Sequence, residues 1–341
     1  MAQRIIIIHG RSTKPAKRAT ANLLRDALLQ GLDRVDRAKG TTSKTRSKAE
    51  RIRSGKIKID YVYYGDINNA ILAKADKTTK AKLTDKDPDC DNAPCLPVGQ
   101  LPAALDALAA IKRFDKRAYR KVLKENTDFR FIDDAARAVS TLASILSASR
   151  FNEYVIKTGT ADMGAYLMTR AVGSEIRERL QNPLKRALKR GDDVCLITHS
   201  MGCMVAYDVL WKFSRMSEYR DVRDNGNRVA RWITLGCPLG EAGVKANLYD
   251  ANERNYRGGT DKHPKGIIRR WVNFAAQDDF ISHDASMKDD YRAMTRYKFI
   301  DSISDYRLYN CFAQEGRSNP HKFFGYLVHP GVANVVAEWM K

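Results

Sequence analysis

Short apolar runs rich in β-branched residues recur along this chain of 341 residues, and longer stretches with helical spacing separate them. The candidate strands are Ile5–Ile8, Ile57–Tyr64, Val194–Thr198, Val229–Leu235, Ile268–Phe274 and a late pair drawn from Tyr297–Ser302 and Tyr306–Cys311. Strands that alternate with helices form a mainly parallel sheet, because each helix returns the chain to the same end of the sheet. We therefore expect an α/β fold whose sites lie beyond the carboxyl ends of the strands.

The stretch from Asp66 to Arg190 departs from this alternation. It contains no convincing strand but several helical patterns, namely Leu101–Phe114, Asp133–Ser149 and Ala171–Leu188. One crossover helix would be enough, and Ala171–Leu188 leads directly into the strand at Val194. The sequence therefore predicts a core of flanked parallel strands in residues 1–65 and 171–341, with residues 66–170 inserted as a helical cap.

Positive charge is abundant, with 60 Lys and Arg against 40 Asp and Glu and a net charge of +20. Between Arg34 and Lys58, ten basic residues stand against two acids, which indicates a mobile basic loop in the first part of the core. Such a loop could gather nucleic acid, anionic lipid or an acidic substrate. No aromatic residues interleave with these charges, which argues against nucleic acid and favours a solvated loop.

Composition also limits the compartment and the cofactors. No apolar stretch approaches the roughly 18 residues of a membrane span, and Ile5–Ile8 is too short for a signal-peptide core. We expect a cytoplasmic protein with no transmembrane segment, for which peripheral contact with an anionic membrane stays open. The six cysteines lack the density of a disulfide scaffold, and Cys90 and Cys95 have no further zinc ligands nearby, so we expect no metal.

A strand runs into a helix at Ser200. The buried-strand pattern Val194–Thr198 precedes the serine, and Gly202 after it would let the strand and helix approach closely. Thr198 stands where a second small residue is commoner. Such a turn strains the backbone at the serine and directs the first helical N–H groups, that of Met201 among them, toward an oxygen bound beside it. The simpler interpretation is a helix N-cap without chemistry.

A serine becomes a nucleophile when a histidine takes its proton and a carboxylate orients that histidine. Asp278 and Asp279 follow the strand Ile268–Phe274, and His321 and His329 precede the last helix. The chain thus presents the order serine, acid, histidine that α/β-hydrolases use.

These segments together resemble the α/β-hydrolase superfamily, and within it the lipase-like and esterase-like serine hydrolases. The stretch from Ile5 to Gly10 is similar to the oxyanion strand, Thr198 to Gly202 to the nucleophile elbow, Trp232 to Gly240 to the strand after the elbow, and Trp271 to Ser282 to the acid-bearing strand and turn. The resemblance covers the chain except for the cap and the basic loop. It implies the fold of that superfamily and a Ser-His-Asp site.

The resemblance also implies individual roles. Counted from Trp271, the acid falls on Asp279, with Asp278 and Asp284 as alternatives. The base falls on His321, which precedes Pro330 by nine residues and is followed by Gly-Tyr-Leu.

His329 directly abuts the last helix, where a capping or packing role suits it better, although it remains the alternative base. The oxyanion donors would be the backbone N–H groups of Met201 and Arg11, and His9 would be structural. We interpret His199, His263 and His283 as bystanders.

The expected activity is hydrolysis of a carboxylic ester, with a small-molecule or lipid ester as substrate and no cofactor. Amide and thioester substrates remain open, because the same groups handle all three. The alternative is a catalytically inert protein of the same fold that holds an anionic partner on its basic surface. Action on membranes through the cap is disfavoured, because its helical patterns lack a strong apolar face.

Overall fold

The computed structural model describes residues 2–41, 46–75 and 161–340, apart from residues 254, 257–258, 277–278, 280–281, 283–285, 309, 311, 315–316 and 319 in the last range. Six parallel strands form one open sheet in the order β2-β1-β3-β4-β7-β8. Their bounds are β1 (Gln3–Ile8), β2 (Lys58–Val62), β3 (Asp193–His199), β4 (Val229–Leu235), β7 (Ile268–Ala276) and β8 (Ser302–Leu308). Helices flank this sheet, so the predicted α/β class is confirmed.

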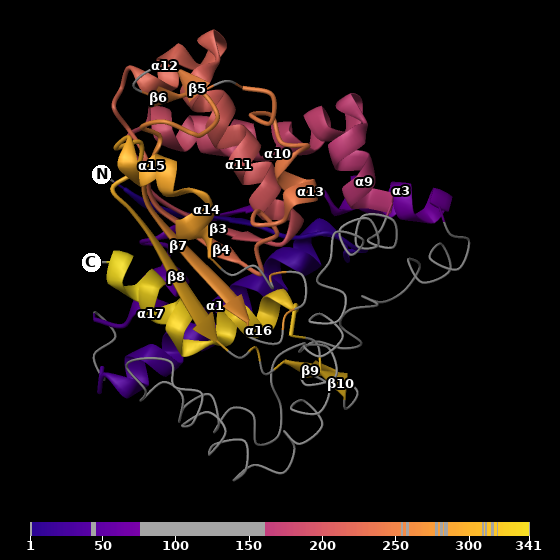
Figure 1. Cartoon of the computed structure of the whole chain (residues 1–341). Helices are drawn as coiled ribbons and strands as arrows, with labels where there is room; N and C mark the ends of the chain where they lie inside the picture. Colours follow the sequence, from indigo (N-terminus) through magenta and orange to yellow (C-terminus); the bar gives the residue numbers. More distant parts are fainter. Residues whose placement is uncertain are drawn as a thin grey trace.

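The longer helices cover both faces of the sheet (Figure 1). One face packs against α1 (Lys17–Ala38), α16 (Phe323–Val328) and α17 (Pro330–Trp339), and the other against α9 (Ala161–Met168), α10 (Arg170–Lys189) and α11 (Met201–Arg215). Alternate residues of β1 enter the two cores, Ile5 and Ile7 on the α1 side and Ile6 and Ile8 on the α10 side. All four are fully buried, which explains why a strand covered on both faces is continuously apolar.

Shorter elements complete the described part of the chain. The helices are α2 (Lys48–Arg53), α3 (Gly65–Ala75), η2 (Ser217–Tyr219), α12 (Arg220–Arg223), α13 (Ala242–Lys245), α14 (Met287–Asp290) and α15 (Arg292–Arg296). Two antiparallel pairs are formed by β5 (Asn255–Tyr256) with β6 (Gly259–Thr260) and by β9 (Ala313–Gln314) with β10 (Arg317–Ser318). Among the described residues, neither the longer nor the shorter helices include one that is long and apolar enough to cross a membrane.

The first five predicted strands are present, whereas the late pair is a single strand. β8 spans Ser302–Leu308 and takes residues from both predicted runs. Tyr297 is instead the C-cap residue of α15, and Lys298 has a φ of 55°. A lysine in this left-handed conformation closes a turn and interrupts any strand there, so pairing begins only at Ser302.

The predicted crossover helix is also present, because α10 runs from Arg170 to Lys189 and leads into β3. Of the predicted cap, the structure describes the two ends, α3 and α9, which pack against each other and lie side by side in Figure 1. The predicted helices Leu101–Phe114 and Asp133–Ser149 lie outside the described residues.

The predicted mobile basic loop is wrong for most of the described part of the segment. Helix α1 continues to Ala38 and its Arg34 is buried, and α2 begins at Lys48. Lys48 Nζ donates to the carbonyl of Met340 at 2.7 Å, and Arg51 donates to the same carbonyl. These cations therefore join α2 to the end of α17 and do not form a free basic surface.

Candidate active site

Ser200 occupies a strained turn between β3 and α11. Its φ is 52° and its ψ is −127°, a conformation that side-chain-bearing residues rarely adopt. Strain of this kind costs about 1–3 kcal/mol and persists where surrounding contacts enforce it. Here the Ser200 N–H donates to the carbonyl of Leu235 at 3.0 Å, and the Ser200 carbonyl accepts from the N–H of Cys203 at 2.8 Å.

Two glycines, one at the start of α11 and one in the loop after β1, allow these two backbone segments to pack closely beside Ser200. A Cβ on Gly202 would lie 2.6 Å from the carbonyl oxygen of His9, and a Cβ on Gly10 would lie 2.7 Å from the Cβ of Ser200. Real Cβ atoms do not tolerate such distances, so the loop after β1 and the start of α11 can pack this closely only with glycine at both positions.

Thr198, where a second small residue was expected, instead belongs to a buried ladder of hydrogen bonds across the sheet. Trp232 Nε1 donates to Thr198 Oγ1 at 3.1 Å, and Trp271 Nε1 donates to Thr234 Oγ1 at 2.9 Å. Thr234 in turn donates to Asn273 Oδ1 at 2.8 Å. Each tryptophan thus finds a hydroxyl on the preceding strand, which satisfies buried polar groups behind the site.

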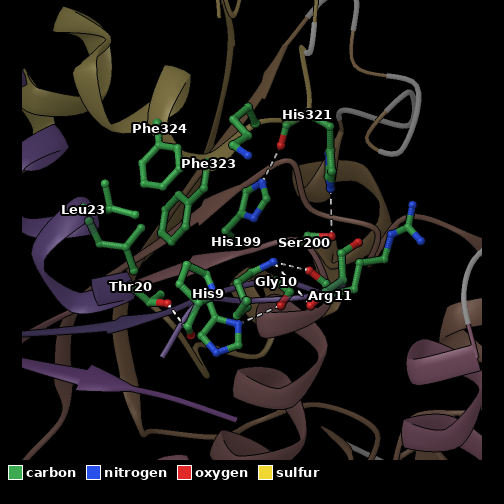
Figure 2. Close-up of a pocket in the computed structure, with 15 residues that line it drawn as sticks. His9, Gly10, Arg11, Thr20, Leu23, His199, Ser200, His321, Phe323 and Phe324 are labelled. Carbon is green, nitrogen blue, oxygen red and sulfur yellow. Dashed lines mark hydrogen bonds between the residues drawn. The ribbon is translucent and has the colours of Figure 1, made fainter. Parts of the chain in front are cut away.

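His321 lies between Ser200 and Asp279. Its Nε2 is 2.8 Å from Ser200 Oγ, and its Nδ1 is 2.8 Å from Asp279 Oδ2 (Figure 2 shows the serine contact). Asp279 is buried, and its Oδ2 also accepts from the hydroxyl of Tyr326 at 2.7 Å. An ionised carboxylate only accepts hydrogen bonds, so Nδ1 carries the proton and Nε2 is left to accept from the serine.

His329 lies apart from this group and caps α17. Its Nδ1 accepts from the N–H of Gly331 at 3.0 Å, the capping role expected for it. Burial lowers the pKa of His329 to about 4, which keeps the ring neutral. Asp278 and Asp284, the alternative acids, lie outside the described residues, as does His283.

The two predicted oxyanion donors belong to backbone that borders the serine. Met201 is the first residue of α11, where N–H groups have no partner within the helix. Arg11 follows Gly10 in the loop after β1 and lies beside Ser200 in Figure 2.

The loop after β1 is held from several sides. Ser12 has a φ of 74°, and its N–H donates to Asp162 Oδ2 of α9 at 2.7 Å. Lys14 Nζ donates to the carbonyls of Arg11 at 2.7 Å and Thr13 at 3.0 Å. The shape of the loop therefore depends on α9, whose Asp162 lies 150 residues after Ser12 in the chain.

His9 is structural, as expected. The N–H of Tyr64 donates to His9 Nε2 at 3.1 Å, so the proton is on Nδ1, which donates to the carbonyl of Gly10 at 2.8 Å. Burial, reinforced by the charge of Lys14, lowers the pKa of His9 to about 3. The ring is therefore neutral and cannot serve as a positive group in the site.

A cavity of about 220 Å³ opens beside Ser200. Apolar side chains from α1 and α16 form one wall, and Figure 2 shows the phenyl rings and a leucine on the side away from Arg11; these residues are Leu23, Leu24, Phe323 and Phe324. Five residues of the loop after β1 also line the cavity: Gly10, Arg11, Ser12, Lys14 and Pro15. The site thus combines a polar reacting end with an apolar recess.

Sequence reasoning missed three residues that surround this group. Asp162 holds the loop after β1, Tyr326 holds Asp279, and His199 contacts the main chain of His321 at 2.7 Å. Tyr326 was visible in the Gly-Tyr-Leu run but without a role. No local pattern marks Asp162, because its partner is far away in the chain.

The described residues contain no group of three or more His, Cys, Asp or Glu side chains placed to hold a metal ion. Cys195, Cys203 and Cys237 are buried free thiols. No family model, curated protein or solved structure matched the chain.

Proposed function

We propose that this protein is a serine hydrolase of the α/β-hydrolase superfamily that cleaves a carboxylic ester through an acyl-enzyme. The observation that carries the proposal is the chain of hydrogen bonds from Asp279 through His321 to Ser200, with the serine on a strained strand-to-helix turn. A helix N-cap would need neither the strained backbone nor a histidine at 2.8 Å.

The positions along the sheet support the same assignment. Ser200 and Asp279 lie just after the carboxyl ends of β3 and β7. His321 lies further along the chain, after β8 and before α16. This is the order and placement that the superfamily uses for nucleophile, acid and base. An open parallel sheet occurs in many other families, so the proposal rests on the site.

The proposed reaction follows from the tautomer of His321. Ser200 Oγ attacks the ester carbonyl while its proton moves to His321 Nε2, and Asp279 stabilises the imidazolium through Nδ1–H. The N–H groups of Met201 and Arg11 would stabilise the oxyanion. His321 then gives the proton to the departing alkoxide, which leaves the acyl group on Ser200. Water attacks the acyl carbonyl while Nε2 of His321 takes its proton; the bond to Ser200 Oγ then breaks, that oxygen receives the proton from Nε2, and the carboxylic acid departs.

The cavity supports an ester with a small apolar group. Leu23, Leu24, Phe323 and Phe324 offer no hydrogen bonds, so they favour an alkyl or aryl chain. A volume of about 220 Å³ is below the roughly 300–1,000 Å³ of pockets for drug-sized ligands, which favours short chains. Amides and thioesters fit the same chemistry.

The decisive experiment combines covalent labelling with ester hydrolysis. A fluorophosphonate probe should label Ser200, and Ser200→Ala should lower the turnover of p-nitrophenyl butyrate by at least about a thousand-fold while thermal unfolding is unchanged. His321→Ala should cost about as much as Ser200→Ala, because the members of such a group act as a unit.

His329→Ala is the matched control. It removes a buried cap at 3.0 Å from Gly331 N and should lower stability with little loss of turnover. An alanine variant at Ser200 that kept more than about a tenth of the activity would rule out the proposed nucleophile.

A further inference from the structure

His199 is the residue directly before Ser200, at the end of β3, and its side chain is 6% exposed. Its Nε2 lies 2.7 Å from the carbonyl oxygen of His321. A carbonyl can only accept, so Nε2 carries the proton and donates to the main chain of the base. Burial, followed by the nearby charge of His321, holds the pKa of His199 well below its ordinary value, and the ring is neutral.

The main chain at His321 needs such support because it belongs to no helix or strand. Residue 321 lies in a turn between β10 and α16. The carbonyl of His321 accepts from His199, and the next carbonyl, that of Lys322, accepts from Asn310 Nδ2 at 2.8 Å. Side-chain donors therefore hold two successive peptide groups that a regular element would otherwise fix.

His321 is therefore connected to the segment His199–Ser200 at two points, through one hydrogen bond to each of the two residues. The side chain of His321 contacts Ser200 Oγ at 2.8 Å, its main chain contacts His199 at 2.7 Å, and His199 and Ser200 are neighbours in the chain. A shift of the turn that carried His321 away from Ser200 would have to break the bond from His199. The arrangement links the position of the base to the position of the nucleophile.

The ring of His199 also forms part of the cavity wall. It stacks on Phe323, with centroids 4.6 Å apart and planes at 7°, and lies 4.7 Å from the ring of His321. His199 could therefore act as a hydrogen-bond donor or only as a flat aromatic surface. These two roles can be separated by substitution.

We propose that His199 is a positioning residue for the ester hydrolysis proposed above, and that it acts by donating Nε2–H to the carbonyl of His321. This inference rests on the proposed function. A displacement of about 1 Å in a reacting group can lower a rate about 100-fold, so loss of the donor should reduce turnover without weakening substrate binding.

A crossed pair of substitutions tests the donor against the surface. His199→Gln keeps an N–H donor near the position of Nε2 but removes the ring, and His199→Phe keeps the ring but removes the donor. We expect the Gln variant to retain kcat within about three-fold and the Phe variant to lose about 10- to 100-fold in kcat at unchanged KM. Fluorophosphonate labelling of Ser200 should likewise be slowed more in the Phe variant than in the Gln variant.

The reverse order, with the Phe variant active and the Gln variant impaired, would overturn the proposal in favour of an aromatic wall. Equal rates in both variants, whether high or low, would also overturn it. Thermal unfolding of each variant controls for folding, and His199→Met would replace a Phe variant that does not fold. If the parent itself is not labelled at Ser200, the proposed function fails, whereas a labelled parent with an unaffected Phe variant refutes only the role of His199.

Discussion

Tyr326 shows how a single residue can serve both the fold and the candidate site. Its buried hydroxyl donates to Asp279 Oδ2 at 2.7 Å and accepts from the N–H of Ala276 at 2.9 Å. Burial, with the nearby charge of Asp279, raises the pKa of Tyr326 well above its ordinary value, so the hydroxyl keeps its proton. The tyrosine thus joins the carboxylate to the end of β7.

We predict that Tyr326→Phe lowers both stability and activity. The change leaves the buried N–H of Ala276 without its acceptor, which should cost about 1–3 kcal/mol in the free energy of unfolding. It also removes one of the bonds that orient Asp279, and we expect kcat for the ester to fall about ten-fold, because a small displacement of a reacting group lowers the rate steeply. Urea unfolding and steady-state kinetics measure the two effects.

Tyr306→Phe is the control for Tyr326→Phe, because Tyr306 is 49% exposed and its ring stacks on Phe274. It should be close to the parent in both measurements. Parent-like stability and kcat in the Tyr326 variant would contradict the role assigned to this hydroxyl.

At the scale of elements, α2 connects the two ends of the described chain. Lys48 and Arg51 donate to the carbonyl of Met340, and Arg51 also donates to Gln3 Oε1 at 2.7 Å. Gln3 Nε2 donates to the carbonyl of Trp339 at 3.0 Å. The two positive side chains satisfy the carbonyl of Met340 at the C-terminal end of α17 and complement the helix dipole. This packing explains part of the basic segment as structural.

We therefore predict that Lys48→Met with Arg51→Met lowers the free energy of unfolding by about 1–3 kcal/mol, because the charged hydrogen bonds to the carbonyl of Met340 and to the side chain of Gln3 are lost. The KM for an anionic ester should not change, at low or high salt, since neither cation faces solvent freely. Arg46→Gln with Lys56→Gln, both exposed, is the matched control and should leave stability unchanged. A KM that rises only at low salt in the Met variant would instead indicate long-range steering.

At the scale of the whole molecule, burial disfavours the charged form of several ionisable groups and shifts their pKa values. Burial lowers the pKa of His263 to about 4, and that of His329 also to about 4, from an ordinary value of 6.5. It raises the pKa of Asp208 to about 6 and that of Asp250 to about 7, from 3.8. A histidine with a lowered pKa reduces the free energy of unfolding as the pH falls. A carboxyl with a raised pKa reduces it as the pH rises.

The contribution of one histidine can be isolated with His329→Asn. Asparagine can still accept from Gly331 N as an N-cap but cannot take a proton. Below pH 6.5 the unfolded parent binds a proton at His329 that the folded form refuses until about pH 4, so the parent loses about 1.4 kcal/mol per pH unit from this group across that window. The variant should lack this loss.

The measurement is the difference in the free energy of unfolding between parent and His329→Asn from pH 7 to pH 4. The opposing contributions of Asp208 and Asp250 are common to both proteins and cancel in that difference. We expect the variant to gain about 3 kcal/mol relative to the parent by pH 4. A difference that is constant with pH would contradict a depressed pKa for His329.

The strands of the sheet and the residues that follow them could be predicted from the amino-acid sequence. β4 has the predicted bounds, and Ser200, His321 and Asp279, the residues that the resemblance to the superfamily implied, form a chain of hydrogen bonds. These features are local, because apolar periodicity and position after a strand are properties of a short stretch of chain.

The contacts between distant segments could not be predicted from the sequence and became visible only in the folded chain. Asp162 meets Ser12 across 150 residues, Lys48 meets Met340 across 292, and His199 meets the carbonyl of His321 across 122. None of these partners has a pattern of its own in the sequence, so a basic segment could be taken for a loop and a histidine for a bystander. Which polar groups pair is settled only when the packed helices and sheet bring them together and burial makes an unpaired group costly.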